Sequence, residues 1–186
     1  MVTVVSDAGP LIHLSQINKL DLLKKLFGVV FITDSVKVEV FDEGIELGHA
    51  DAKAIGKALA DGWLKTAFFP QSLARSAAKL EKAENISQTD AETLLLAVDK
   101  KAVLLVDEKL LANLAKMYGL KVWDTWTILL QSLREDYLEL NGITIAINEL
   151  RKTKFTLNEK QAQELLADAK VIEKHKSEKI NKQKFS

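Results

Sequence analysis

Short runs of apolar residues alternate along this chain with longer segments in which apolar residues recur every three or four positions. The short runs predict buried strands at residues 2–5, 29–32, 62–65, 102–106 and 120–123. The longer segments predict helices at residues 11–27 (with a second helix starting at Asn18 or Asp21), 33–41, 50–59, 72–84, 90–101 and 108–118. Short apolar strands separated by helices indicate an α/β fold whose parallel sheet is covered on both faces.

The pattern changes near residue 141, beyond which only helical spacing remains. Two helices are predicted there, at residues 143–150 and 158–172, and the last segment, 173–186, is rich in lysine and has few apolar anchors. We therefore expect an α/β domain over residues 1–140, a helical extension packing on it over 141–172, and a flexible tail over 173–186.

The composition excludes several kinds of site. The chain has no cysteine, which rules out disulfides, thiolate zinc sites and a cysteine nucleophile, and its three histidines are far apart in the sequence. A bound metal would be hard and oxygen-ligated, so Mg²⁺ or Mn²⁺ is expected. Lysine plus arginine balances aspartate plus glutamate at 26 each, which counts against a broadly basic nucleic-acid surface and leaves a local basic patch open.

The sequence carries no signal for a membrane or for secretion. No apolar run approaches the roughly 18 residues that span a bilayer. The N-terminus enters a predicted strand directly, without a basic segment or a signal-type apolar core. A cytoplasmic location is expected.

Two aspartates directly follow predicted strands. Asp7 comes after the first strand and before Ala8-Gly9-Pro10, which predicts a tight turn, and Asp107 comes after the run 102–106. Such positions lie at the carboxyl edge of a parallel sheet, where α/β proteins build their sites. Each residue also has a structural explanation, since Asp7 can accept hydrogen bonds within the turn. Asp107 can cap the next helix, with Glu108 in its first turn.

Three further acids lie close to predicted helix starts. Glu39 flanks the apolar face of the helix that Thr33 can cap, and a solvated surface glutamate is its structural alternative. Asp90 opens another helix, where the macrodipole stabilises an acid. Glu92 fits a capping box with Thr89 as the N-cap, so Asp90 ranks above Glu92 as a metal ligand.

Together these acids predict a divalent-metal site. Several carboxylates at one sheet edge repel one another strongly, and a divalent cation removes that cost. Mg²⁺ held by carboxylates can bind a phosphate oxygen, activate a water and stabilise a departing oxyanion. Phosphodiester hydrolysis requires these functions and no nucleophilic side chain.

Four segments match an ordered set of motifs. Residues 4–14, 27–39, 89–97 and 104–108, the last running on to 119–122, resemble in order the four motifs of the PIN-domain family. Within the first segment, residues 6–12 read SDAGPLI, which resembles the start of a prokaryotic branch of that family. The segment from Asn141 onward resembles the helical tail of the same branch, so the resemblance covers almost the whole chain.

This resemblance implies an α/β/α sandwich around a central parallel sheet. It also implies a Mg²⁺- or Mn²⁺-dependent endoribonuclease, similar to the toxins of VapBC-type toxin–antitoxin systems, with RNA as substrate, an antitoxin as partner and a homodimeric assembly. Carried over motif by motif, the catalytic residues are Asp7, Glu39, Asp90 and Asp107. The metal ligands implied are Asp7, Asp90 and Asp107, with Glu39, Glu92 and Glu108 as alternatives.

Two other functions are compatible with the sequence. A non-catalytic PIN-like module that binds protein or RNA fits the neutral net charge and a fourth motif, Val106-Asp107-Glu108, that lacks the threonine of many PIN nucleases. A phosphatase that uses a phosphoacceptor aspartate would need a second acid where this chain has Gly9. The basic residues nearest to the acids, and thus candidates for contacting RNA phosphates, are Lys37, Lys109 and Lys116.

Overall fold

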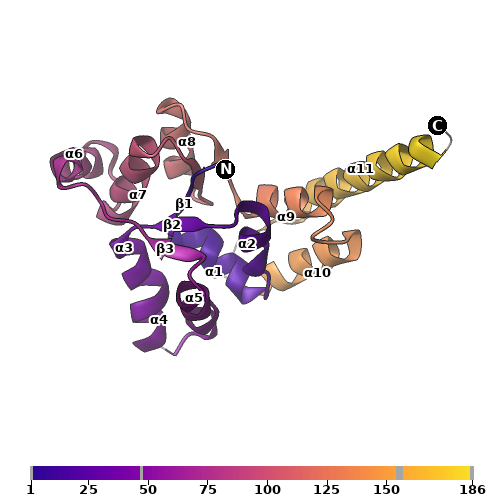
Figure 1. Cartoon of the computed structure of the whole chain (residues 1–186), viewed down its shortest axis with the longest axis horizontal. Coiled ribbons are helices and arrows are strands. Elements are labelled where there is room, and N and C mark those ends of the chain that lie inside the picture. The colour runs from indigo at the N-terminus through magenta and orange to yellow at the C-terminus, as the bar shows by residue number, and fades with distance from the viewer. Residues whose placement is uncertain (1, 47, 154–156, 185–186) are drawn as a thin grey trace. The chain divides into compact units, whose positions relative to one another are not determined.

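A five-stranded parallel sheet with the strand order β3-β2-β1-β4-β5 forms the centre of residues 1–125 (Figure 1). This computed structural model describes residues 2–46, 48–153 and 157–184. The strands are β1 (Val4–Ser6), β2 (Val30–Ile32), β3 (Leu64–Thr66), β4 (Val103–Leu105) and β5 (Val122–Trp123). The predicted parallel α/β sheet is therefore confirmed, with β1 as its middle strand.

The neighbouring strands β1 and β4 are largely apolar because both of their faces are covered. Val4 and Val5 of β1 and Leu104 and Leu105 of β4 are completely buried. Parallel strands that alternate with helices have no solvent-facing side, so they carry continuous apolar runs rather than an alternating pattern.

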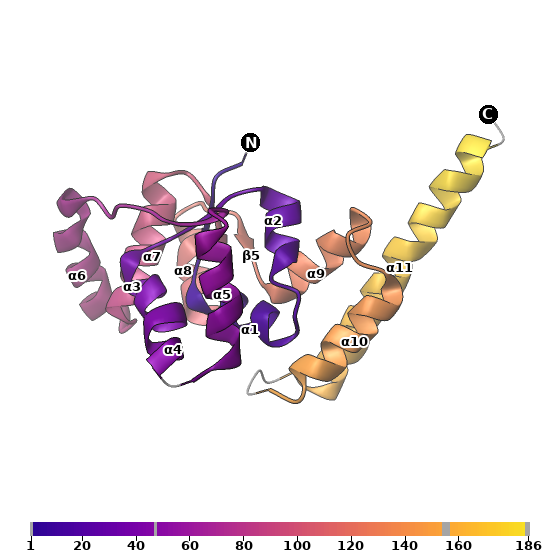
Figure 2. The same ribbon diagram turned by 60° about the horizontal axis from the view of Figure 1, so that its bottom comes forward.

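Helices flank the sheet within residues 1–125. In chain order they are α1 (Ala8–Gln16), α2 (Asp21–Phe27), α3 (Asp34–Lys37), the π-helix η1 (Val38–Asp42), α4 (Glu43–Glu46), α5 (Ala50–Ala60), the 3₁₀-helix η2 (Gln71–Leu73), α6 (Ala74–Glu84), α7 (Gln88–Asp99) and α8 (Lys109–Met117). Buried residues of α6, α7 and α8 form one core cluster with β1 and β4, while α1 packs against α5 (Figures 1 and 2). This arrangement is the α/β/α sandwich that the family resemblance implied.

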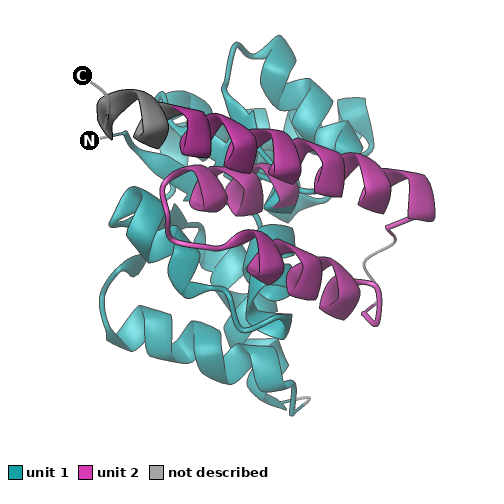
Figure 3. Cartoon of the chain, turned by 90° about the vertical axis from the view of Figure 1, so that its right-hand side faces the viewer, with its two compact units in different colours: residues 1–125 teal, residues 126–186 magenta. Residues whose placement is uncertain are grey.

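The chain divides into two compact units, residues 1–125 and residues 126–186 (Figure 3). Unit 1 contains the sheet. Unit 2 is helical and comprises nearly all of α9 (Thr125–Arg134), then α10 (Leu140–Leu150) and α11 (Glu159–Lys184). The domain boundary predicted at residue 140 falls at the first residue of α10, inside unit 2. Among the described residues, no helix has the length and apolar character needed to cross a membrane.

Three elements differ from the sequence-based expectation. The segment Ala8-Gly9-Pro10, expected as a turn, is the first turn of α1, where proline is tolerated because its missing N–H has no intrahelical acceptor. Helix α9 was not predicted, although its buried residues Ile128, Leu129 and Leu133 follow helical spacing.

Helix α11 is the third difference, because it continues to Lys184 instead of ending at residue 172. No glycine or proline interrupts this stretch, so nothing in the chain stops the helix. Within unit 2, the Lys176 ammonium donates to the Leu133 carbonyl (2.9 Å) and pairs with the Asp136 carboxylate. These contacts attach the helix to its own unit beyond the predicted end.

Candidate functional site

Asp7 directly follows β1 at the carboxyl edge of the sheet, where it occupies the N-cap position of α1. Its side chain is 8 % exposed, yet it makes no cap hydrogen bond to the helix. Pro10, the third residue of the helix, has no N–H to offer it. The Asp7 backbone N–H donates to the Leu105 carbonyl (2.9 Å), which ties the residue to the end of β4.

The Asp7 carboxyl group is held in an unfavourable environment for a charge. Burial raises its pKa from 3.8 to about 7, the nearby N–H groups of Ala8 and Gly9 oppose the shift, and the negative charges of Asp90 and Glu39 add to it. The structure therefore brings Asp7, Asp90 and Glu39 close enough to repel one another. These three acids come from three segments far apart in the chain.

Asp107 lies beside Asp7, at the carboxyl end of β4. A Cβ atom placed on Gly9 would be 3.5 Å from Asp107 Oδ2 and 3.8 Å from Asp7 Oδ2, so the two carboxylates flank this glycine. Asp107 Oδ1 accepts from the Thr125 N–H, and Oδ2 accepts from the Thr125 hydroxyl and from His13 Nδ1, all at 2.7 Å. Asp107 is consequently held in one orientation by Thr125, the first residue of α9, and by His13 of α1.

Glu108 serves as a helix cap. It is the N-cap of α8, and its Oε2 accepts from the Leu111 N–H at 2.7 Å. The structure thus assigns the cap to Glu108, whereas the sequence allowed Asp107 to have that function. Of the two adjacent acids, Asp107 is the one that lies next to Asp7.

Replacing Glu108 by alanine is expected to lower the free energy of unfolding by about 1 kcal/mol, because the cap of α8 is lost. Glu108→Asp keeps a side chain that can cap and should recover most of this loss. Urea unfolding measures the stability, and Mn²⁺ titration measures the site. Loss of Mn²⁺ binding in Glu108→Ala with its fold intact would identify Glu108, not Asp107, as the ligand.

Asp90 lies in a capping box that differs from the predicted one. Helix α7 begins at Gln88, with Ser87 as its N-cap; the Ser87 hydroxyl accepts from the Asp90 N–H (3.0 Å), and Asp90 Oδ2 accepts from the Ser87 N–H (3.1 Å). The predicted box between Thr89 and Glu92 is therefore wrong, because Ser87 and Asp90 form the same motif two residues earlier. Asp90 has one carboxylate oxygen engaged in the box.

Glu92 has a tertiary partner instead of a capping function. Its Oε2 accepts from the Ser35 hydroxyl of α3 (2.5 Å), and its Oε1 accepts from the Gln88 amide (2.7 Å). A capping function therefore does not rank Glu92 below Asp90, since Asp90 is the capping residue. Asp90 still has the closer electrostatic link to Asp7, whose pKa it raises.

Glu39 lies in the π-helix η1, which follows α3 directly. Thr33 caps α3 as predicted, with its hydroxyl accepting from the Val36 N–H at 3.1 Å. Partial burial raises the pKa of the Glu39 carboxyl, and the charges of Asp90 and Glu43 raise it further. π-Helical turns are rare and are found frequently at functional sites.

The donors at this edge fit a hard divalent cation in chemistry and charge. They are carboxylate oxygens, they repel one another, and a cation of charge two would remove the repulsion that raises the pKa of Asp7. Among the residues that the structure describes, however, no three histidine, aspartate or glutamate side chains are grouped so that they could hold a metal ion. Binding would require side-chain movement that draws the acids together.

The three lysines proposed for RNA contacts occupy different settings. The Lys37 ammonium pairs with Asp42 (3.0 Å) and lies 5.6 Å from the centre of the Phe41 ring. Lys109 is the first residue of α8, close to the carboxyl end of β4, and Lys116 is in the last turn of the same helix. At 1.5 Å per residue, Lys116 is about 10 Å farther along the helix than Lys109. The assignment of all three lysines to RNA contacts stays a prediction.

Two residues of this site were not recognised in the sequence. His13 and Thr125 both hold Asp107, but they lie 94 and 18 residues away from it along the chain. His13 is the residue after the SDAGPLI motif and lies on α1, the helix whose N-cap position Asp7 occupies. Its closeness to Asp7 in the sequence was the one sign that it could belong to the site. Thr125 is the second residue after β5, the last strand, which places it at the carboxyl edge of the sheet.

A parallel sheet with acidic side chains gathered at the carboxyl edge of its central strands defines an α/β protein with an acidic site of the type found in metal-dependent hydrolases. The particular family follows from comparison with known families. Residues 3–171 match the family DUF3368, described as a PIN domain, and the chain belongs to this family. The PIN domain is a nuclease-associated fold, and its members typically bind Mg²⁺ or Mn²⁺. No curated protein matches the chain.

Proposed function

We propose that this protein is a divalent-metal-dependent endoribonuclease that hydrolyses RNA phosphodiesters with an activated water. The observation that supports it most is the buried Asp7 carboxyl, whose pKa is raised to about 7 by burial and by the charges of Asp90 and Glu39. A buried carboxylate surrounded by like charges is costly in a purely structural role. It becomes favourable once a cation is bound, and the PIN-domain membership supports that reading.

In this proposal Asp7, Asp90 and Asp107 would hold the Mg²⁺ or Mn²⁺, with Glu39 completing the site and Glu92 as the alternative to Asp90. The bound cation supplies Lewis-acid polarisation of a phosphate oxygen and lowers the pKa of water. Thr125 and His13 orient the Asp107 carboxylate through their hydrogen bonds.

Glu39 adds a proton acceptor to this arrangement. Its carboxylate, whose pKa is raised by partial burial and by the charges of Asp90 and Glu43, would accept a proton from an attacking water. Lys109, at the start of α8, and Lys37 are the cations that would contact the RNA phosphates, with Lys116 farther along α8.

The test is a cleavage assay on single-stranded RNA with the metal added, removed and restored. RNA should be cut with Mn²⁺ present, remain intact with excess EDTA, and be cut again once Mn²⁺ is added back. Isothermal titration with Mn²⁺ should detect binding by the same preparation. Absence of both cleavage and Mn²⁺ binding would instead favour a non-catalytic PIN-like module that binds RNA or protein, which agrees with the lack of a preformed ligand cluster among the described residues.

The biological setting that we propose is a toxin component of a VapBC-type toxin–antitoxin system in the cytoplasm, acting as a homodimer and bound by an antitoxin. This extends the family membership, which by itself establishes a PIN domain. Expression of the protein alone should then arrest growth, and co-expression of the neighbouring small gene product should relieve the arrest.

A further inference from the structure

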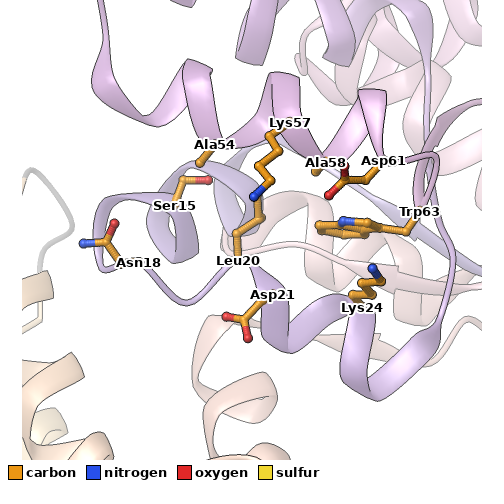
Figure 4. Close-up of a pocket in the computed structure, with 10 residues that line it drawn as sticks. All are labelled: Ser15, Asn18, Leu20, Asp21, Lys24, Ala54, Lys57, Ala58, Asp61 and Trp63. Carbon is orange, nitrogen blue, oxygen red and sulfur yellow. The ribbon is translucent and has the colours of Figure 1, made fainter.

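A cavity of about 330 Å³ lies in unit 1, and Figure 4 shows the residues that line it. The end of α1, the start of α2, helix α5 and Trp63, the residue before β3, contribute to its lining. Trp63 marks the amino edge of the sheet, whereas Asp7 marks the carboxyl edge. Helix α1 connects the two sites, and its nine residues separate them by about 13 Å. The volume lies within the range of small-molecule sites, which begins near 300 Å³.

Two lysines and two aspartates line this cavity, so their formal charges balance, but one of the aspartates is already paired with a lysine outside the lining. Lys24 and Lys57 line it, and in the described part of the chain neither ammonium group has an ion pair or hydrogen bond. Asp21 also lines the cavity, but its carboxylate is bound by Lys25 at 2.7 Å. Asp61 is therefore the lining acid whose carboxylate can accept a hydrogen bond from a ligand, and it shares the cavity with the ammonium groups of Lys24 and Lys57.

Two further hydrogen-bond donors lack partners at this place. The Ser15 hydroxyl is buried and makes no hydrogen bond within the described residues, and Figure 4 shows it directed toward the Lys57 side chain. The Trp63 residue is 7 % exposed, and its indole N–H makes no hydrogen bond in that same part of the chain but is not fully buried. Leaving a buried donor unpaired costs about 1–3 kcal/mol, so the Ser15 hydroxyl calls for an explanation.

The directions of the side chains suggest how a ligand would lie. Lys57 reaches from α5 toward Leu20, Lys24 lies on one side of the Trp63 ring, and Asp61 lies on the other side (Figure 4). Unpaired ammonium groups bind an anion, and an indole edge accommodates a flat apolar ring. The Asp61 carboxylate can accept from an N–H or O–H of the same molecule.

We infer that this cavity binds a nucleoside monophosphate, with the phosphate at Lys24 and Lys57, the base beside Trp63, and a hydroxyl or amino group at Asp61. A phosphate, a planar ring and hydrogen-bond donors in one small molecule satisfy the unpaired groups together. This site is independent of the proposed ribonuclease activity, because it involves none of the acids at the carboxyl edge.

The inference is tested on the full chain by NMR titration with each of the four ribonucleoside 5′-monophosphates, in EDTA so that metal at the acidic site has no influence. The Trp63 indole N–H signal, identified by its absence in Trp63→Phe, and the Ser15 and Asn18 amides should shift. Lys24→Ala and Lys57→Ala should each weaken the affinity by about tenfold or more, since each removes a charge-assisted hydrogen bond.

Lys53→Ala is the matched control, because Lys53 is an exposed lysine one turn earlier on α5 that does not line the cavity. Its affinity should equal that of the wild type. The inference is overturned if millimolar nucleotide leaves the Trp63 signal unchanged, if Lys24→Ala and Lys57→Ala bind as tightly as Lys53→Ala, or if inorganic phosphate binds as tightly as the nucleotides. Shifts confined to Asp7 and Gly9 would also overturn it.

Discussion

Asp7→Asn is expected to abolish Mn²⁺-dependent RNA cleavage while the protein remains folded. Asparagine has nearly the same shape as aspartate but carries no charge, so it cannot replace an anionic ligand at the carboxyl end of β1. Changes to residues that merely support a ligand already cost about 10- to 100-fold. Loss of the ligand itself should therefore reduce the cleavage rate by at least about a hundredfold, measured on a single-stranded RNA under Mn²⁺ saturation for the wild type.

Asp34→Asn provides the matched control for this experiment. Asp34 is an exposed aspartate in the first turn of α3, directly after the cap that follows β2, so the same chemical change is made at the same sheet edge. It should cleave RNA at the wild-type rate. Wild-type cleavage by Asp7→Asn would remove Asp7 from the mechanism, and equal loss in both variants would show that the effect is not specific to Asp7.

Features set by local sequence were predicted well. The buried strands β1 and β4 consist of apolar residues throughout their centres, so their positions were found to within a residue or two. Helix α2 starts at Asp21, and Thr33 caps α3, as the local patterns indicated. Each of these features depends on residues within a few positions of one another.

Two kinds of feature could not be predicted from local sequence: the choice between two competing capping patterns, and contacts between residues far apart in the chain. Ser87 with Asp90 and Thr89 with Glu92 both match the capping-box pattern, and only the packed start of α7 decides between them. The contact between His13 and Asp107 joins residues 94 positions apart, and no local sequence pattern predicts it. The fold brings the acids Asp7, Glu39 and Asp90 near one another, with Asp107 beside Asp7, and their assignment as site residues stays a prediction; the groups that orient Asp107 emerged only in the fold.

The stability of the protein is expected to fall as the pH rises from about 4 to 7, because Asp7 keeps its proton in the folded state. Below pH 3.8 the Asp7 carboxyl is protonated in both the folded and the unfolded chain, so it makes no difference. Between 3.8 and about 7 the unfolded chain loses this proton and the folded chain retains it. The pKa difference of about three units corresponds to about 4 kcal/mol of destabilisation above pH 7.

Asp7→Asn should reverse that loss, since asparagine cannot ionise. We expect the stability of Asp7→Asn relative to the wild type to increase by about 2–3 kcal/mol between pH 5 and pH 8, measured by urea unfolding in EDTA. Taking the difference between the two proteins cancels the titration of shared groups that do not interact with Asp7. Glu39, whose raised pKa acts in the same direction, interacts with Asp7 and therefore cancels only in part. A difference that stays constant over this range would show that Asp7 is ionised in the folded protein throughout. The same substitution would thus remove the activity and stabilise the fold at neutral pH, which is the behaviour of a charge retained for ligand binding rather than for structure.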